Sequence, residues 1–162
     1  MVVLGLDPGL GTTGYAVVNS GHGVIRLVEA GVIRTKASLP LERRLAELAD
    51  GLAQVMDEYR PDTMAVEDLY SHYAHPKTAV IMGHARGVFF LIAGKAGITV
   101  TSYSATRIKK SLTGTGHATK DQVARMIANV LSLDAFEGPA DVTDAIATAL
   151  CHIQTVSHGG IE

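Results

Sequence analysis

The first 34 residues contain three strand-like segments joined by short connections, and this arrangement restricts the possible folds more than any other feature. Val2 to Asp7 begins with β-branched residues and is followed by Pro8-Gly9, which is typical of a strand that ends in a sharp turn. Residues 15–18 and 23–33 are the next two segments, and Gly31 is a candidate site for a β-bulge. Successive strands with connections this short predict an antiparallel meander.

After residue 40 the apolar residues recur every three or four positions, which is the repeat of an amphipathic helix. The repeat runs from Leu41 to Met56 and ends before Pro61. Beyond it the sequence predicts strands at 63–67 and 98–103 and helices at 78–95, 105–112, 119–131 and 142–154. A meander followed by alternating helices and strands predicts an α/β protein with a central mixed five-stranded sheet flanked by helices.

The composition limits the classes of protein to which the chain can belong. Its 162 residues, 47% hydrophobic and 19% charged, suit one folded domain and exclude a disordered chain. The single Cys151 excludes an internal disulfide framework and a cysteine-rich zinc site. The longest uninterrupted apolar run, 88–93, is far shorter than the roughly 20 residues of a membrane span, so we expect a cytoplasmic protein with no membrane partner. Because the formal net charge is −2, binding to nucleic acid would require a local basic patch.

Four acidic residues are notable for their positions in these elements. Asp7 and Glu67 end the first and fourth strands, and Asp141 and Asp144 begin the last helix. A spacing of three places the last two on one helix face, with their Cβ atoms about 5–6 Å apart. If the first and fourth strands are neighbours, all four carboxylates meet at one end of the sheet, where they would repel unless Mg²⁺ or Mn²⁺ neutralises them. Two such ions can activate water and stabilise an oxygen that leaves phosphorus.

Local structure offers a second explanation for three of these acids. An aspartate before Pro-Gly often hydrogen-bonds the backbone of its own turn, as Asp7 would. Asp141 suits a helix N-cap, and Asp144 suits the positive end of a helix dipole. Glu67 has no comparable structural reason to end an apolar strand. Asp68 would point to the opposite face of that strand, as a surface group.

Seven short motifs occur in a fixed order along nearly the whole chain. They are Gly5-Leu6-Asp7-Pro8-Gly9, Thr13-Gly14-Tyr15, Ile33-Arg34-Thr35, Ala65-Val66-Glu67, Ala85-Arg86-Gly87, Gly114-Thr115-Gly116 and Ala140-Asp141-Val142-Thr143-Asp144-Ala145. In order and residues they resemble the RuvC-type Holliday-junction resolvases, a family with a ribonuclease H-like fold. The resemblance implies a single ribonuclease H-like nuclease domain over residues 1–156, followed by a flexible tail at 157–162.

The resemblance also implies the chemistry. It places the catalytic and metal-binding acids of the family on Asp7, Glu67, Asp141 and Asp144, which would hold two Mg²⁺ ions per subunit, with Mn²⁺ as a substitute. The implied reaction is metal-dependent, symmetric hydrolysis of phosphodiesters in a four-way (Holliday) DNA junction, during homologous recombination and DNA repair. The implied assembly is a homodimer that works with a branch-migration complex of RuvA- and RuvB-type proteins.

Basic residues gather between residues 105 and 125, where five positive charges face one negative charge. Such cations can bind phosphates, although a cluster of this kind is more often a solvated helix face. Lys109 and Lys120 match basic positions that the family places near the cut strand. Tyr70 matches an aromatic that the family places near the junction centre, where it would stack on a base; the alternative is a loop tyrosine that covers the edge of the core. The expected DNA-binding residues are therefore Tyr70, Arg107, Lys109, Lys110 and Lys120.

Two predicted helices carry further residues of interest. The helix 78–95 contains Gly83 and Gly87, and the resemblance places it at the dimer interface. Arg86 in the same helix requires either a paired acid or exposure to solvent. In the last helix we expect Cys151 to be a buried thiol and His152 a hydrogen-bonded histidine, and we expect neither to serve metal or redox chemistry.

Three other functions compete with this interpretation. Asp7 with the glycines that follow it resembles the phosphate loop of actin-like sugar kinases and chaperone ATPases, but those enzymes close two domains around ATP, and 162 residues leave no room for the second. A metal nuclease for RNA–DNA hybrids would share the acids but not the other motifs. A junction-binding module without catalysis would bind DNA and leave it uncut, which four intact acids argue against.

Overall fold

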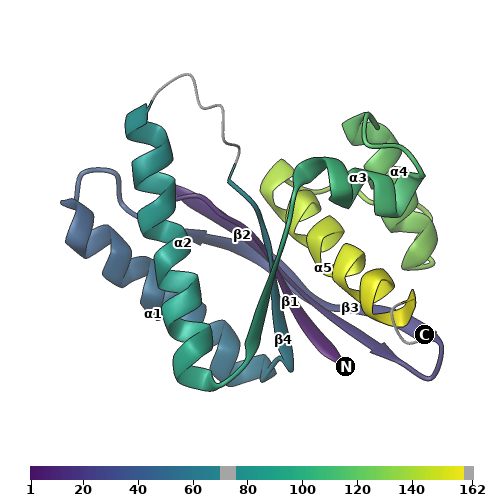
Figure 1. The fold of residues 1–162 in the computed structure, drawn as a ribbon, viewed down its shortest axis with the longest axis horizontal. Coiled ribbons are helices and arrows are strands. Elements are labelled where there is room, and N and C mark those ends of the chain that lie inside the picture. Colours follow the sequence, from purple (N-terminus) through teal and green to yellow (C-terminus); the bar gives the residue numbers. More distant parts are fainter. Residues whose placement is uncertain (70–75, 159–162) are drawn as a thin grey trace.

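The computed structural model describes residues 1–69 and 76–158, and its centre is a mixed five-stranded sheet (Figure 1). The strands are β1 (Val2–Asp7), β2 (Thr12–Gly21), β3 (Val24–Arg34), β4 (Thr63–Glu67) and β5 (Thr99–Tyr103), in the sheet order β3-β2-β1-β4-β5. The first three form the antiparallel meander that the short connections predicted, and β4 and β5 continue the sheet in parallel with β1. The predicted fold class is confirmed.

Helices cover both faces of the sheet, as the sequence predicted. Helices α1 (Leu41–Tyr59) and α2 (Pro76–Ala96) lie on one face, and α5 (Ala140–His158) lies on the other with α3 (Ala105–Thr113) and α4 (Lys120–Val130) beside it (Figure 1). Each face has its own buried cluster because side chains alternate along a strand. Leu4 and Val66 pack toward α1 and α2, whereas Val3 and Ala65 pack toward α5.

Two glycines allow α5 to lie directly on the backbone of the central strands. A Cβ atom on Gly5 of β1 would overlap the main-chain oxygen of Ala145, and a Cβ atom on Gly14 of β2 would overlap the main-chain oxygen of Asp141. Gly14 is also the register partner of Asp7. The first turn of α5 therefore lies beside the end of β1.

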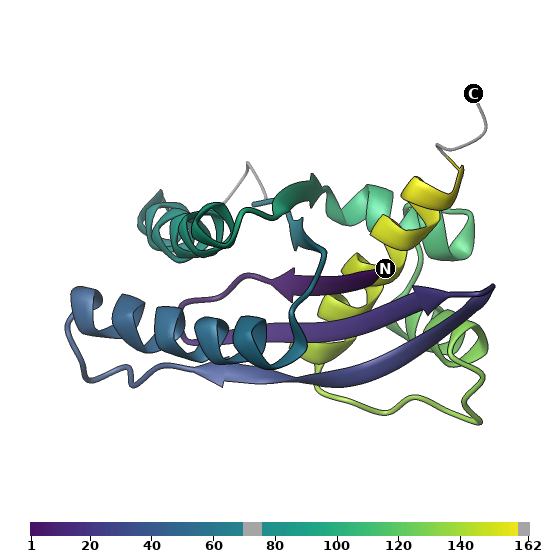
Figure 2. The same ribbon diagram turned by 90° about the horizontal axis from the view of Figure 1, so that it is seen from below.

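The bulge prediction at Gly31 was wrong. Figure 2 shows β2 and β3 as a long pair of strands joined by a tight turn. Their register shifts between Val17 and Val18, which pair with Glu29 and Leu27, so the extra residue is Val28. Gly31 instead leaves room for an aromatic ring, because a Cβ atom there would come within 2.9 Å of the Tyr15 hydroxyl. The glycine thus serves a close side-chain contact.

The last helix is longer than predicted, and the end of the chain lies outside the described residues. Helix α5 continues to His158 and so includes the first residues of the tail expected from 157, and residues 159–162 are not described. As expected, Cys151 is buried, and His152 is buried with its Nδ1 atom hydrogen-bonded to the Tyr103 hydroxyl at 2.9 Å.

One helix among the described residues, 77–96 in α2, is long and apolar enough to cross a membrane, with a mean hydropathy of 1.3. Its inner face carries the buried residues Ala85, Phe89 and Ala93, which belong to the core cluster under α1. Its outer face leaves Val80 59% and Leu91 57% exposed. The expectation based on the short run 88–93 did not foresee this exposed apolar face.

Candidate active site

Asp7 and Glu67 lie side by side at one edge of the sheet. Strands β1 and β4 are parallel neighbours in which Leu6 pairs with Val66, so the next residue on each strand is one of the two acids. The side-chain alternation that turns Leu6 and Val66 toward α1 and α2 turns both acids toward α5. The strand adjacency on which the sequence prediction depended is therefore confirmed.

The first turns of α5 bring the other two acids to this edge. Helix α5 begins at Ala140, and the half-buried Asp141 and Asp144 follow on one face. The charges of Glu67, Asp144 and Asp141 all act on Asp7. The four carboxylates thus share one electrostatic environment, although they come from three elements.

Burial and mutual repulsion make the carboxyl groups of Asp7, Glu67 and Asp144 hold their protons unusually strongly. Burial is the largest cause that raises the pKa of Asp7 to about 8, and the neighbouring carboxylates add to it. Burial and the charge of Asp144 raise the pKa of Glu67 to about 7. Burial also raises the pKa of Asp144, with a further contribution from Asp141. Such groups are stabilised in their charged form by a nearby cation.

Lys109 and Lys120 supply two cations at the same place. Both line a cavity of about 470 Å³ together with Glu67 and Asp144. Lys120 opposes the rise in the pKa of Asp7 and of Asp144, and Lys109 opposes it in Glu67 and Asp144. Lys120 opens α4, whose start is held by a capping box between Thr119 and Gln122. The other walls are largely apolar and include Ile108, Val123, Phe136 and Ala147.

The remaining expected DNA-binding residues lie elsewhere or outside the described part. Arg107 and Lys110 are exposed on α3 and do not line the cavity, and the Arg107 guanidinium lies 5.1 Å from the centre of the Tyr103 ring. Tyr70 falls in the segment 70–75, outside the described residues. Of the four lysines and arginines expected to bind DNA, two therefore line the cavity and two lie on the exposed surface of α3.

The turn after Asp7 is held by Thr13. Its buried hydroxyl donates to the main-chain oxygen of Gly9 at 2.6 Å and accepts from the Gly9 N–H at 3.3 Å. The Asp7 carboxylate accepts no hydrogen bond within residues 1–69 and 76–158, so the explanation of Asp7 as a turn-forming aspartate finds no support there.

The sequence prediction missed two features of this site. Phe136 forms part of the cavity wall from the connection before α5, where no periodic pattern marks it. Arg86 was expected to need either a paired acid or exposure to solvent, and it pairs with Asp68 at 2.9 Å. Its hydrogen bond to the main chain of Glu67 had no signal in the sequence. Long-range contacts of this kind depend on the order of the strands.

The donor chemistry of the cleft fits divalent cations. The carboxylates of Asp7, Glu67, Asp141 and Asp144 are hard oxygen donors, and in the described part of the chain none of them accepts a hydrogen bond or joins an ion pair. No three Asp, Glu, His or Cys side chains among the described residues lie at the spacing that would hold a metal ion. The backbone thus places the donors at one edge of the sheet without closing them around a common point.

Known proteins resemble this chain over almost its whole length. The family model described as Crossover junction endodeoxyribonuclease RuvC matches residues 3–152. A crossover junction endodeoxyribonuclease RuvC from Rhodopirellula baltica is 48% identical over 149 residues, which cover 92% of this chain and 84% of that protein.

Two solved structures have the same fold. The Thermus thermophilus RuvC structure has a TM-score of 0.89 and 33% identity, and it covers 98% of this chain and 97% of that chain. The structure of T. thermophilus RuvC in complex with a Holliday junction substrate has a TM-score of 0.92 at the same identity, with 98% and 96% covered.

Proposed function

This chain belongs to the RuvC family of crossover junction endodeoxyribonucleases, and we propose that it cuts four-way DNA junctions at the cleft that holds its four carboxylates. The observation that carries the proposal is the meeting of Asp7 and Glu67, at the ends of two parallel strands, with the first turns of α5. The family and the junction complex of the Thermus relative support the substrate.

The proposed catalytic and metal-binding residues are Asp7, Glu67, Asp141 and Asp144. When bound there, divalent cations, Mg²⁺ with Mn²⁺ as a substitute, would supply an activated water and neutralise charge on the oxygen that leaves phosphorus. Two ions per subunit suit four carboxylates better than one, since two divalent cations would balance the charge of four ionised acids, and burial together with mutual repulsion disfavours that charge at Asp7 and Glu67. The four carboxylates bind and orient the metal ions. Because the carboxylates are partly buried, bulk water screens their attraction to the ions less than it would at an exposed site.

Lys109 and Lys120 bind the phosphate groups of the cut strand. Both lie beside the carboxylates on the wall of the same cavity, so a phosphate that contacts either ammonium group is brought to the acidic edge. A positive charge in this position also stabilises the negative charge that develops on phosphate oxygens during hydrolysis. We propose supporting contacts to more distant phosphates from the exposed Arg107 and Lys110, and a stacking contact from Tyr70.

The outer face of α2 supports a homodimer. It presents Val80, Phe90 and Leu91 to solvent, and Gly83, Gly87 and Gly94 lie among them with open space around each. Large side chains separated by glycines on one helix face permit close approach of a second helix. A dimer across this face would carry two clefts and could cut two strands of one junction.

The cellular setting follows from the family. We propose that the protein acts in the cytoplasm, in homologous recombination and DNA repair, and with a branch-migration complex of RuvA- and RuvB-type proteins. The two buried clusters on opposite faces of one sheet support a single nuclease domain over residues 1–156.

Initial cleavage rates on three substrates test this function. A synthetic four-way junction, a linear duplex with the sequence of one arm, and an RNA–DNA hybrid are each incubated with Mg²⁺ or with EDTA. We expect nicks in the junction with Mg²⁺ only, and little cutting of the other two substrates. Preferred cutting of the hybrid would indicate a ribonuclease instead, and binding without cutting would indicate a junction-binding module.

A further inference from the structure

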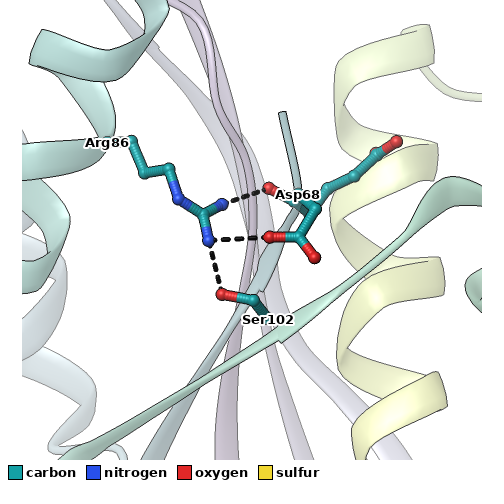
Figure 3. Close-up of polar contacts among 4 residues, drawn as sticks. Asp68, Arg86 and Ser102 are labelled. Atoms are coloured by element: carbon teal, nitrogen blue, oxygen red, sulfur yellow. Dashed lines mark hydrogen bonds and ion pairs between the residues drawn. The ribbon is translucent and has the colours of Figure 1, made fainter. Parts of the chain in front are cut away.

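Arg86 of α2 makes polar contacts with three residues at the ends of strands β4 and β5 (Figure 3). Its Nη1 atom donates a hydrogen bond to the main-chain oxygen of Glu67 at 2.7 Å. Its Nη2 atom donates to Oδ1 of Asp68 at 2.9 Å and to Oγ of Ser102 on β5. The guanidinium carbon also lies 5.1 Å from the centre of the Phe90 ring on α2. One side chain thus connects α2 with the ends of two strands.

The bond to Glu67 helps to fix one peptide unit. The amide group that follows Glu67 has its carbonyl bonded to Arg86, and its N–H, which belongs to Asp68, donates to the main-chain oxygen of Tyr103 at 2.8 Å. A planar peptide unit that is bonded at both polar atoms cannot turn without breaking one of the two bonds. The backbone torsion that joins Glu67 to this unit is therefore restrained.

This restraint acts where the sheet itself gives less support. The pairing of β4 with β1 ends at Val66, and at Glu67 only β5 remains as a pairing strand. Glu67 is also the last residue of β4. At Glu67, Arg86 therefore takes the place of the missing pairing strand β1. The side chain of Glu67 lines the cleft on the other face of the sheet.

Helix α2 also contacts the core through residues other than this arginine. Ala85, Phe89 and Ala93 on its inner face are completely buried. The Arg86 side chain is 16% exposed and forms the only ion pair within residues 1–69 and 76–158. A half-buried ion pair is weak evidence for a contribution to stability. The planar guanidinium does offer several donors in a fixed arrangement, which a lysine cannot reproduce.

From these contacts we propose that Arg86 is a positioning residue: by fixing the peptide unit after Glu67, it sets the direction in which the Glu67 carboxylate enters the acidic cleft. Arg86 touches neither the substrate nor the reacting atoms, and its effect reaches the site through Glu67. The inference rests on the proposed function, because it takes Glu67 to be a metal ligand and catalytic acid.

The variants Arg86→Met and Arg86→Lys test the proposal, with Lys95→Met as the matched control. Lys95 is an exposed cation in the last turn of the same helix. Mn²⁺ binding to the protein without DNA is measured by electron paramagnetic resonance of the free ion. We expect Arg86→Met to raise the Kd for Mn²⁺ by about tenfold or more, as is typical when a partner of a metal ligand is removed. Arg86→Lys should recover part of this loss, and Lys95→Met should equal the wild type.

Junction cleavage supplies the second measurement. In Arg86→Met we expect the midpoint of the Mg²⁺ dependence to rise and kcat to fall, while KM for the junction stays unchanged. A residue that served only stability would lower Tm and leave the Mn²⁺ Kd and the Mg²⁺ midpoint of the folded protein at wild-type values. That outcome overturns the proposal.

A third variant separates the contacts and protects the test from misfolding. Ser102→Ala removes one partner of Arg86 but leaves the bond to the Glu67 carbonyl, so we expect wild-type Mn²⁺ binding. If Arg86→Met does not fold, Arg86→Lys decides: a wild-type Mn²⁺ Kd, or a loss no larger than that of Ser102→Ala, overturns the proposal. A wild-type protein that cuts no junction overturns the proposed function as well, whereas wild-type cutting with unaffected Arg86 variants overturns this inference alone.

Discussion

The α-carbon of Gly14 faces the main-chain carbonyl oxygen of Asp141 at so short a range that any Cβ atom on Gly14 would overlap that oxygen. Gly14 is in turn the register partner of Asp7. The distance between the first strand and the first turn of α5, and with it the distance between two of the acids, therefore depends on the absence of a side chain on β2.

Replacing Gly14 by alanine should consequently damage both stability and activity. We expect Gly14→Ala to lower the free energy of unfolding by about 1–3 kcal/mol, because the backbone of α5 must move to admit the methyl group. The displaced Asp141 should lower junction cleavage even in protein that is fully folded. Urea unfolding and cleavage rates at a temperature well below Tm measure the two effects.

Gly21→Ala is the matched control, since Gly21 ends the same strand and a Cβ atom there would come no closer than 3.9 Å to the side chain of Asn19. This substitution should leave the free energy of unfolding unchanged or raise it by up to about 1 kcal/mol, because alanine restricts the unfolded chain more than glycine does. Equal effects of Gly21→Ala and Gly14→Ala would contradict the close packing of α5 on β2.

Without metal, the protein should become less stable as the pH rises from about 4 to about 8. Burial and repulsion raise the pKa of Asp7 to about 8 and that of Glu67 to about 7, whereas both carboxyls titrate near pH 4 in the unfolded chain. In this window the folded state binds more protons than the unfolded state, so the free energy of unfolding falls with increasing pH. Thermal unfolding in EDTA at several pH values measures this slope.

Asp7→Asn should reduce that slope and stabilise the metal-free protein at pH 8. The proton affinity of Asp7 differs between the folded and unfolded states, and the substitution abolishes this difference. Each tenfold difference that is abolished changes the free energy of unfolding by about 1.4 kcal/mol. Asp57→Asn, at an exposed position on α1, is the control and should leave the slope as it is. A wild-type slope in Asp7→Asn would show that Asp7 is not under electrostatic strain in the folded protein.

The same Asp7→Asn variant should separate binding from catalysis. We expect the rate of cleavage in Mg²⁺ to fall at least about a hundredfold. Removing a metal ligand should reduce activity at least as much as removing a residue that only hydrogen-bonds to a ligand. The Kd for the junction in EDTA should stay unchanged or decrease, since a negative charge near DNA has been removed. Electrophoretic mobility shifts and single-turnover cleavage measure the two quantities, and parallel loss of both would argue against a metal-binding role.

Lys120→Ala should weaken a phosphate contact. We expect slower cleavage, by at least about tenfold if the ammonium group stabilises developing charge. The slope of log K for junction binding against log salt concentration should decrease in magnitude by about 0.9 if one phosphate contact is lost. Lys95→Ala, at the far end of α2, should change neither quantity. A wild-type slope and rate in Lys120→Ala would indicate that Lys120 is only a solvated residue on the surface of α4.

The elements of this fold could be predicted from sequence because each has a local signal. The alternation of the meander and the helical repeat from Leu41 to Met56 reflect side-chain periodicity within a few residues. The bulge was misplaced because a glycine inside a strand has more than one use. At Gly31 the packing of the Tyr15 ring decides that use, and the extra residue falls at Val28.

The site was only partly open to prediction from sequence. Asp7 and Glu67 could be paired because both end apolar strands, but their proximity requires β1 and β4 to be neighbours, which no local pattern specifies. The count of positive charges between residues 105 and 125 did not separate Lys109, which lines the cavity, from Arg107, which lies over the Tyr103 ring. The bond from Arg86 to the Glu67 carbonyl spans 19 residues and two elements, so only the folded chain reveals it.

The positions of the cuts in a synthetic four-way junction test the central claim most directly. Each of the four strands is labelled in turn, and the products formed with Mg²⁺, with Mn²⁺ and with EDTA are separated on denaturing gels. A homodimer with one carboxylate cleft in each subunit predicts nicks at symmetric positions in two strands of like polarity, present with either metal and absent in EDTA. A junction that the protein binds but leaves uncut in both metals would contradict the account.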